Sequence, residues 1–369
     1  MKVVVVIPTY NERENILVLL KALAKAFAGK TKHAISYLVV DDTSPDKTAD
    51  VVNEYRKVHK NVFLISGKKQ GLGKALLRGM TEAFERMHAD VVLQMDADLS
   101  HDPETAPKLL DAIDHGATFA VGSRYIKGGG IPENWGFIRK IYSIVGNTIV
   151  RFGLWHPQIR DWTGGYRAYT RRFYEATHHE LDRYSGYVFQ MAFLHKSLHH
   201  GAVVSEIPFQ FTDRRYGHSK IAPAEYIFNI YKYIAVSRFQ EFVAGSFFKF
   251  GIVGTIGFII NTVVLWAMVR AGIFPAIGSA VGAELAVISN FILNNAWTFG
   301  DRRVRGKRMI PKFIQFNVAS LGAILIQTGT VWAGTTLFGR GTYFISYLCG
   351  VGLGLIWNYT MYSKVIWKK

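Results

Sequence analysis

The sequence predicts an α/β domain followed by an all-α membrane domain with four transmembrane helices. Short apolar, β-branched runs alternate with helical stretches in the first hundred residues, as in a parallel sheet covered by helices. The last third instead contains long apolar runs that can cross a bilayer. Charge divides at the same point, because residues 1–245 hold 32 basic and 25 acidic residues whereas residues 246–369 hold 12 and 2.

The α/β domain begins with Val3–Ile7, an entirely apolar run typical of a central strand buried on both faces. Three further strands are expected at Ser36–Val40, Val62–Ser66 and Val91–Met95. Helices are expected between the strands at Glu14–Ala28, Asp46–Lys57 and Lys74–His88. Parallel strands end at the same edge of a sheet, so polar residues should converge there from three segments: Pro8–Glu12, Asp41–Asp46 and Asp96–Asp98.

Two familiar nucleotide-binding motifs do not occur at these strand ends. The first strand is followed by Pro8-Thr-Tyr-Asn11 without a glycine, which excludes the dinucleotide-binding fingerprint. Gly71-Leu-Gly-Lys74 resembles a phosphate-binding loop, but Ala75 stands where that loop needs a serine or threonine to bind magnesium. The sequence therefore supports neither an NAD enzyme nor an ATPase.

The segment Asp96-Ala97-Asp98 follows a hydrophobic strand and is the strongest candidate for a metal site. Side chains two residues apart on an extended strand share a face, so both carboxylates can serve one site. Mg²⁺ or Mn²⁺ typically binds one or two protein carboxylates and completes its shell with diphosphate oxygens and water. A nucleotide-sugar transferase needs this arrangement, because the metal neutralises the departing diphosphate.

Four spans are predicted in the last third of the chain, at Phe250–Val269, Pro275–Phe299, Phe313–Phe338 and Tyr343–Ser363. The loop between the second and third spans, Asp301–Lys312, carries six basic residues. The positive-inside rule places that loop in the cytoplasm, and an even number of spans then places both termini there too. We therefore expect a multi-pass protein of the cell membrane with cytoplasmic termini.

The basic character of the chain does not indicate a nucleic-acid partner. The net charge is +17, yet 49% of the residues are hydrophobic, which is too apolar for a basic DNA- or RNA-binding protein. The expected partner is instead the lipid bilayer. Ile138, Ile141, Val145, Ile149 and Phe152 recur at helical spacing between basic residues, as in a helix that lies at the membrane interface.

We predict three parts: a catalytic domain over 1–222, an interfacial amphipathic helix and linker over 223–245, and the membrane domain over 246–369. Several motifs of this chain resemble glycosyltransferase family 2, whose catalytic domains have the GT-A fold. Within that family the chain is similar to the dolichol-phosphate mannose synthases, of the archaeal type fused to a GtrA-like membrane domain. The resemblance depends on segments found in the expected order: Val5–Glu12, Val39–Asp42, Asp96–Asp98, Gly122–Tyr125, Asp161–Tyr169, Asp213–Lys220 and Asn290–Phe299.

The resemblance implies a GDP-mannose site at the strand ends. Pro8, Tyr10 and Glu12 would line the nucleoside, and Asp41 would accept hydrogen bonds from the base. The ribose and diphosphate would lie at Asp96, Ala97 and Asp98, with the metal held by Asp96, Asp98 and Ser100.

The acceptor would be dolichol phosphate or another polyprenyl phosphate. A phosphate that is already ionised needs cations to hold it more than it needs a general base. The expected acceptor residues are Arg124, Arg139, Arg214, Ser219 and Lys220, and the catalytic residues are Asp96, Asp98, Arg124, Arg139, Arg214 and Lys220. Direct displacement predicts inversion at the sugar. Two alternatives stay open: the same chemistry with UDP-glucose as donor, and a translocator of lipid-linked sugars.

Overall fold

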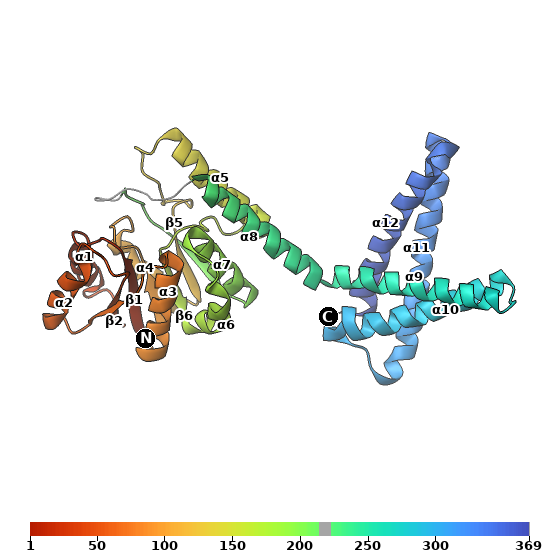
Figure 1. Ribbon diagram of the computed structural model, residues 1–369, viewed down its shortest axis with the longest axis horizontal. Helices are drawn as coiled ribbons and strands as arrows, with labels where there is room; N and C mark the ends of the chain where they lie inside the picture. The colour runs from red at the N-terminus through yellow and green to blue at the C-terminus, as the bar shows by residue number, and fades with distance from the viewer. Residues whose placement is uncertain (214–222, 369) are drawn as a thin grey trace. The chain divides into compact units, whose positions relative to one another are not determined.

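The computed structural model describes residues 1–213 and 223–368 (Figure 1). These residues form two compact units, Met1–Ser237 and Arg238–Lys369. The division falls inside helix α8 (Pro223–Ala244), within the segment that the sequence analysis assigns to a linker. The boundaries at residues 222 and 245 remain predictions from the sequence.

Within residues 1–213, seven strands form one sheet in the order β3-β2-β1-β4-β6-β5-β7. The four predicted strands are confirmed as β1 (Lys2–Thr9), β2 (Ala34–Asp41), β3 (Val62–Ser66) and β4 (Val91–Gln94), and they pair in parallel. The remaining strands are β5 (Phe119–Ser123), β6 (Arg167–Thr170) and β7 (Val204–Pro208). The expectation of a parallel sheet is wrong at β6, which runs antiparallel to both β4 and β5.

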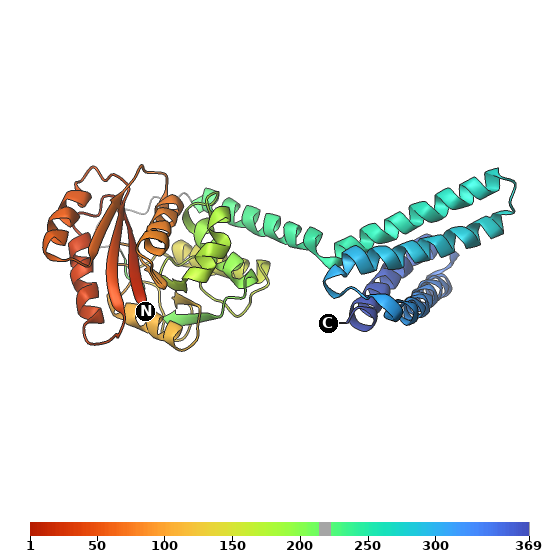
Figure 2. The same ribbon diagram turned by 90° about the horizontal axis from the view of Figure 1, so that it is seen from below.

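Helices cover both faces of this sheet (Figure 2). On one side lie α1 (Ile16–Phe27), α2 (Thr48–Val58) and α4 (Ala106–Asp114), whose buried apolar residues form one cluster with Val3, Val5 and Ile7 of β1. On the other lie α3 (Leu72–Thr81), α6 (Arg171–Leu181) and α7 (Gly186–His199), packed with Val4 and Val6. The alternation of apolar side chains along β1 therefore builds two cores, as the all-apolar run predicts.

Helix α5 (Phe137–Gly153) carries the predicted amphipathic stripe, and that stripe faces outward. Ile138 is 65% exposed and Phe152 is 56% exposed, whereas the buried residues of α5 are Asn147 and Val150. The first half of α8 lies beside the end of α5, since the Cβ position of Gly153 is 2.9 Å from the Ile234 side chain (Figure 1). An apolar helical face left open to the surroundings is the feature expected of an interfacial helix.

In the second unit, the described residues include four helices long and apolar enough to cross a bilayer. They are α9 (Ser246–Arg270), α10 (Pro275–Leu293), α11 (Met309–Phe338) and α12 (Tyr343–Met361), in agreement with the four predicted spans. Helices α9 and α10 pack along each other, as do α11 and α12 (Figures 1 and 2). Most of their large apolar side chains are exposed, as a lipid-facing surface requires.

One end of the four-helix unit is closed by an aromatic cluster that includes Phe250, Phe316, Tyr362 and Trp367. The buried side chain of Asn295 connects this cluster to the basic loop. Its Oδ1 accepts hydrogen bonds from Trp367 Nε1 at 2.9 Å and from the Val304 N–H at 2.8 Å. The basic loop between α10 and α11 is therefore anchored to the end of the chain.

Candidate active site

The carboxyl ends of β1, β2 and β4 meet at one edge of the sheet, as predicted. Thr9 pairs with Asp41 in the sheet register, and the Met95 N–H donates to the Val6 carbonyl at 3.2 Å. Each of the three loops that leave these strands contains a non-glycine residue with positive φ: Asn11 at 61°, Thr43 at 53° and Leu99 at 62°. Such backbone conformations are costly for branched side chains and cluster at functional sites.

Asp41 is fully buried and organises the loop after β2. Its Oδ1 accepts hydrogen bonds from the hydroxyls of Thr9 at 3.0 Å and Ser44 at 2.6 Å, and its Oδ2 accepts one from the Ser44 N–H at 2.9 Å. The carboxylate predicted to bind the base thus holds the shape of the loop that follows β2.

Pro8, Tyr10 and Glu12 lie on the neighbouring loop. Pro8 is buried, and the Lys69 ammonium lies 3.5 Å above the centre of the Tyr10 ring. Glu12 accepts a hydrogen bond from the Asn15 side-chain amide at 2.8 Å. The Glu12 N–H donates to Thr48 Oγ1 at 3.0 Å, which joins the loop after β1 to the start of α2.

Asp96 and Asp98 stand directly after β4 in different surroundings. The Asp96 side chain is 32% exposed, whereas Asp98 is 4% exposed and Ala97 is buried. Asp98 Oδ1 accepts two hydrogen bonds from Ser100, from the N–H at 3.1 Å and from the hydroxyl at 2.6 Å. Ser100, the third predicted metal ligand, is therefore in direct contact with the second.

His101 is a site residue that the sequence analysis missed. The Asp96 N–H donates to His101 Nδ1 at 3.1 Å, and His101 Nε2 lies 4.0 Å from Asp96 Oδ2. The ring stacks on Tyr166 with centroids 4.9 Å apart. Burial lowers the pKa of His101, although the carboxylates of Asp96 and Asp98 act in the opposite direction. A neutral imidazole thus supports the backbone of the carboxylate turn, and its position three residues after Asp98 is the only hint in the sequence.

Arg124, at the end of β5, forms a buried ion pair with Asp161. Arg124 Nε donates to Asp161 Oδ2 at 2.7 Å and Nη2 donates to Oδ1 at 2.8 Å, a bidentate contact. Burial opposes the charge on both groups, but their mutual attraction raises the pKa of Arg124 and holds the pKa of Asp161 below its ordinary value. Nη2 also donates to Thr163 Oγ1 at 2.9 Å, so Arg124 is rigidly held.

The loop that carries Asp161 reaches Asp96. A Cβ placed on Gly165 would lie 3.4 Å from Asp96 Oδ1, so the backbone of this loop passes the proposed metal ligand closely. The loop is held in place by Arg167, a fully buried residue that the sequence analysis did not single out. Its guanidinium donates to the carbonyls of Trp162 at 2.8 Å and Gly164 at 2.9 Å, and burial lowers its pKa to about 10.

Phe211 lies between the carboxylate turn and the arginines. Its ring lies 6.2 Å from His101, 5.6 Å from Trp135 and 5.6 Å from the Arg124 guanidinium, measured between centres. Arg139, on the first turn of α5, stacks over Trp135 at 3.8 Å. The segment after β7 therefore brings together the carboxylate turn, Arg124 and the start of α5.

Arg139 is half-exposed and donates to Asp213 Oδ1 at 3.3 Å, an oxygen that also accepts from Trp135 Nε1 at 2.7 Å. The other acceptor residues predicted from the sequence, Arg214, Ser219 and Lys220, lie outside the described residues. The described part of the site thus combines two carboxylates suited to a divalent cation with two arginines, of which Arg139 is half-exposed and Arg124 is paired with Asp161.

Comparison with known families assigns both parts of the chain. Residues 4–177 match Glycosyl transferase family 2, and residues 249–367 match the GtrA/DPMS transmembrane domain. A Dolichol-phosphate mannosyltransferase from Pyrococcus furiosus is 35% identical over 100% of this chain and 99% of its own length.

Two bacterial relatives match the first part of the chain. The Polyprenol monophosphomannose synthase of Mycolicibacterium smegmatis is 38% identical over 60% of this chain and 81% of its own length. The Undecaprenyl-phosphate mannosyltransferase of Micrococcus luteus is 34% identical over 65% and 97%. The chain described here belongs to the dolichol-phosphate mannosyltransferase family, and it is a multi-pass membrane glycosyltransferase whose first domain has a GT-A-like fold.

Proposed function

We propose that the protein transfers mannose from GDP-mannose to the phosphate of dolichol or another polyprenol and releases GDP. The observation that carries this proposal is the approach of two charged sets at one edge of the sheet. The Asp96–Asp98 turn lies against the loop of Asp161, whose carboxylate holds Arg124. The names of the relatives, each a transferase of mannose to a polyprenyl phosphate, support the choice of sugar and acceptor.

We assign Mg²⁺ or Mn²⁺ to Asp96 and Asp98. The donor set fits such an ion, because both side chains are hard oxygen ligands and the hydrogen bonds from Ser100 fix the orientation of Asp98. When bound, the ion supplies positive charge opposite the departing diphosphate. The Ser100 hydroxyl stays a predicted third ligand.

The nucleotide would lie across the loops that follow β1 and β2. Pro8, Tyr10 and Glu12 would border the nucleoside, and Asp41 would face the base from the loop that it organises. Ala97, between the two carboxylates, would lie beside the ribose and diphosphate. These roles rest on the resemblance to the family.

On the acceptor side, the lipid phosphate is largely dianionic at neutral pH, since its second pKa is about 6. Arg124 and Arg139 would hold it, aided by Arg214, Ser219 and Lys220. One phosphate oxygen forms a bond to the anomeric carbon while the bond from that carbon to the diphosphate oxygen breaks, and its electron pair leaves with GDP. Because attack comes from the side opposite the leaving group, an α-linked donor gives a β-linked product.

The reaction would take place at the cytoplasmic face of the membrane. The six basic residues of Asp301–Lys312 support this orientation, and both termini would then be cytoplasmic. The exposed apolar face of α5 supports contact between the catalytic domain and the lipid surface.

The test incubates the full chain in nanodiscs with polyprenyl phosphate, Mn²⁺ and radiolabelled GDP-mannose or UDP-glucose. We expect label to enter the organic phase from GDP-mannose and not from UDP-glucose. If label is transferred only from UDP-glucose, the donor is UDP-glucose and the assignment of GDP-mannose is wrong. If the chain binds nucleotide sugars but transfers none of them, the enzymatic proposal is wrong and a translocator becomes the better account.

A further inference from the structure

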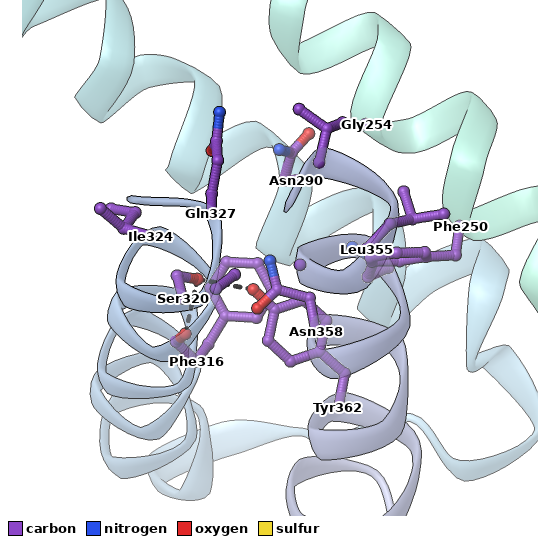
Figure 3. A pocket seen from close by; sticks show the side chains of 14 residues that line it. Phe250, Gly254, Asn290, Phe316, Ser320, Ile324, Gln327, Leu355, Asn358 and Tyr362 are labelled. Atoms are coloured by element: carbon purple, nitrogen blue, oxygen red, sulfur yellow. Dashed lines mark hydrogen bonds between the residues drawn. The ribbon is translucent and has the colours of Figure 1, made fainter. Parts of the chain in front are cut away.

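The membrane domain contains a cavity of about 320 Å³ to which the proposed reaction gives no role (Figure 3). All four spans contribute to its wall, and its volume lies in the range of about 300–1,000 Å³ found for small-molecule sites. Six of the lining residues have polar amide or hydroxyl side chains: Asn290, Asn294, Ser320, Gln327, Asn358 and Tyr362. We call this space the amide cavity.

Polar side chains are costly inside a bilayer, and three of these amides are not satisfied by the protein. Within the described residues, Oδ1 of Asn290, Asn294 and Asn358 is buried and accepts no hydrogen bond. Figure 3 shows Asn290, Gln327 and Asn358 reaching the same space from α10, α11 and α12. Uncompensated polar groups at membrane depth mark a functional site.

The chemistry of the wall selects the ligand. Among the described residues that line the amide cavity, none is charged, so an ion would find no opposite charge there to compensate for its removal from water. Amide oxygens need hydrogen-bond donors, whereas an ionised phosphate offers only acceptors. A hydroxyl group is both donor and acceptor. The rest of the wall is aliphatic and aromatic, including Phe250, Phe316 and Leu355, which suits the apolar faces of a sugar ring or the start of a hydrocarbon chain.

We propose that the amide cavity binds the uncharged, hydroxyl-rich head group of a lipid, namely a glycosyl group carried on a hydrocarbon chain. Recognition of hydroxyls follows from the cavity itself, and only the choice of mannose as the probe rests on the proposed function. The site is separate from the Asp96–Asp98 turn, which belongs to the other unit.

Two residues of the cavity wall can each be substituted and compared with a similar residue outside the wall. Gly254 lines it, and a Cβ at that position has no heavy atom within 4 Å, so a larger side chain enters open space. Gly251, on the same helix, is equally open but does not line the cavity. Asn358 can be compared with Asn317, a span amide outside the cavity wall that donates to its own helix, to the Phe313 carbonyl at 3.0 Å.

The experiment uses the full chain in nanodiscs and dodecyl β-mannoside bearing a photoreactive diazirine on its sugar. We expect cross-links to peptides of α10, α11 and α12. An excess of unlabelled dodecyl mannoside should abolish these cross-links. Dodecyl phosphate, dodecanol and methyl mannoside should leave them unchanged. Asn358→Leu and Gly254→Leu should each lower this labelling at least tenfold. The matched variants Asn317→Leu and Gly251→Leu should keep it.

Several outcomes would overturn the proposal. If dodecyl phosphate competes as well as dodecyl mannoside, the cavity is an anion site. If dodecanol competes equally, it is a site for the hydrocarbon chain alone. If methyl mannoside competes equally, it is a site for free sugar. Equal loss in the matched variants, or no labelling of the spans, would also contradict it. Mannosyl transfer is assayed separately in the same nanodiscs, so a failure of the proposed reaction leaves the binding result interpretable.

Discussion

Asp98 and Asp161 are both buried carboxylates, yet their partners give them different tasks. Asp98 is oriented by Ser100 and stands beside the more exposed Asp96, so the two carboxylates can bind the same cation. Both carboxylate oxygens of Asp161 already accept hydrogen bonds, from Arg124 in a bidentate contact and from the Gly164 N–H at 3.0 Å. We therefore expect loss of Asp98 to affect catalysis and loss of Asp161 to affect stability first.

Asp98→Asn should lower mannosyl transfer by about 10²–10³-fold, because a metal ligand contributes several kcal/mol and each 1.4 kcal/mol corresponds to tenfold in rate. The amide keeps the shape of the carboxylate, so the melting temperature should change little. Initial rates with GDP-mannose and thermal unfolding in nanodiscs check both statements. Asp111→Asn, an exposed position on α4, is the matched control. A nearly normal rate for Asp98→Asn would remove the metal assignment.

Asp161→Asn should lower the free energy of unfolding by about 3–5 kcal/mol, because it leaves the buried guanidinium of Arg124 without its counter-charge. Adding Arg124→Gln should cost less than the sum of the two single changes. Chemical unfolding of the three variants measures this coupling. Strict additivity would mean that the two groups do not stabilise each other.

The same pair predicts a pH dependence. Burial alone would raise the pKa of Asp161, but attraction and hydrogen bonds from Arg124 lower it, so the stabilisation is fully present above the pKa of an unfolded aspartate, about 3.9. This stabilisation is lost as the pH falls through the lower pKa that Asp161 has in the folded protein. The difference in melting temperature between wild type and Asp161→Asn should hold from pH 7 to pH 5 and narrow only below about pH 4. A difference that narrows near neutrality would contradict this assignment.

Residues at the ends of parallel strands could be predicted to meet, whereas pairings between loops distant in the sequence could not. Asp96, Ala97 and Asp98 could be predicted because they follow a strand directly. The partner of Arg124 lies 37 residues away, and no local pattern marks the pairing. Arg167 and Phe211 act through backbone carbonyls and ring contacts, which leave no chemical signature in a sequence.

At the scale of secondary structure, the first four strands could be predicted because each is a buried apolar run between helices. Strand β6 could not, since Arg167–Thr170 is a four-residue segment and a period of two carries no information on strand direction. Its antiparallel course matters for the site. It returns the chain past β4 directly after the Asp161–Gly165 loop, and so places that loop beside Asp96.

The exposed face of α5 leads to a prediction at this scale. Replacing Ile138, Ile141 and Val145 together by serine removes apolar surface that would otherwise enter the lipid interface, at about 25 cal/mol per Å². We expect the KM for a long-chain polyprenyl phosphate in nanodiscs to rise about tenfold, with little change for a soluble ten-carbon prenyl phosphate. Val18→Ser with Val58→Ser, two exposed valines on α1 and α2, is the control. Equal effects on both acceptors would argue against an interfacial α5.

For the whole molecule, the division of charge and hydropathy corresponds to the two compact units. The first 245 residues contribute 7 of the 17 surplus positive charges and the remainder contributes 10, the differences between their basic and acidic residues. In the second unit the basic residues concentrate in the loop that Asn295 joins to Trp367. The surplus of positive charge is therefore mainly a feature of the membrane domain.

The orientation of that domain gives the last prediction, and the single cysteine of the chain makes it simple to test. In a Cys349→Ala background, we introduce Lys307→Cys in the basic loop or Gly341→Cys in the turn between α11 and α12, both at exposed positions. Asp301–Lys312 contains six basic residues, whereas the Arg340–Thr342 turn contains one, so the basic loop should face the cytoplasm.

A membrane-impermeant maleimide should label Gly341→Cys in intact cells and label Lys307→Cys only after permeabilisation. The background without cysteine should stay unlabelled. The reverse pattern would place the catalytic domain outside the cell, away from cytoplasmic nucleotide sugars. It would therefore contradict the proposed site of the reaction as well as the topology.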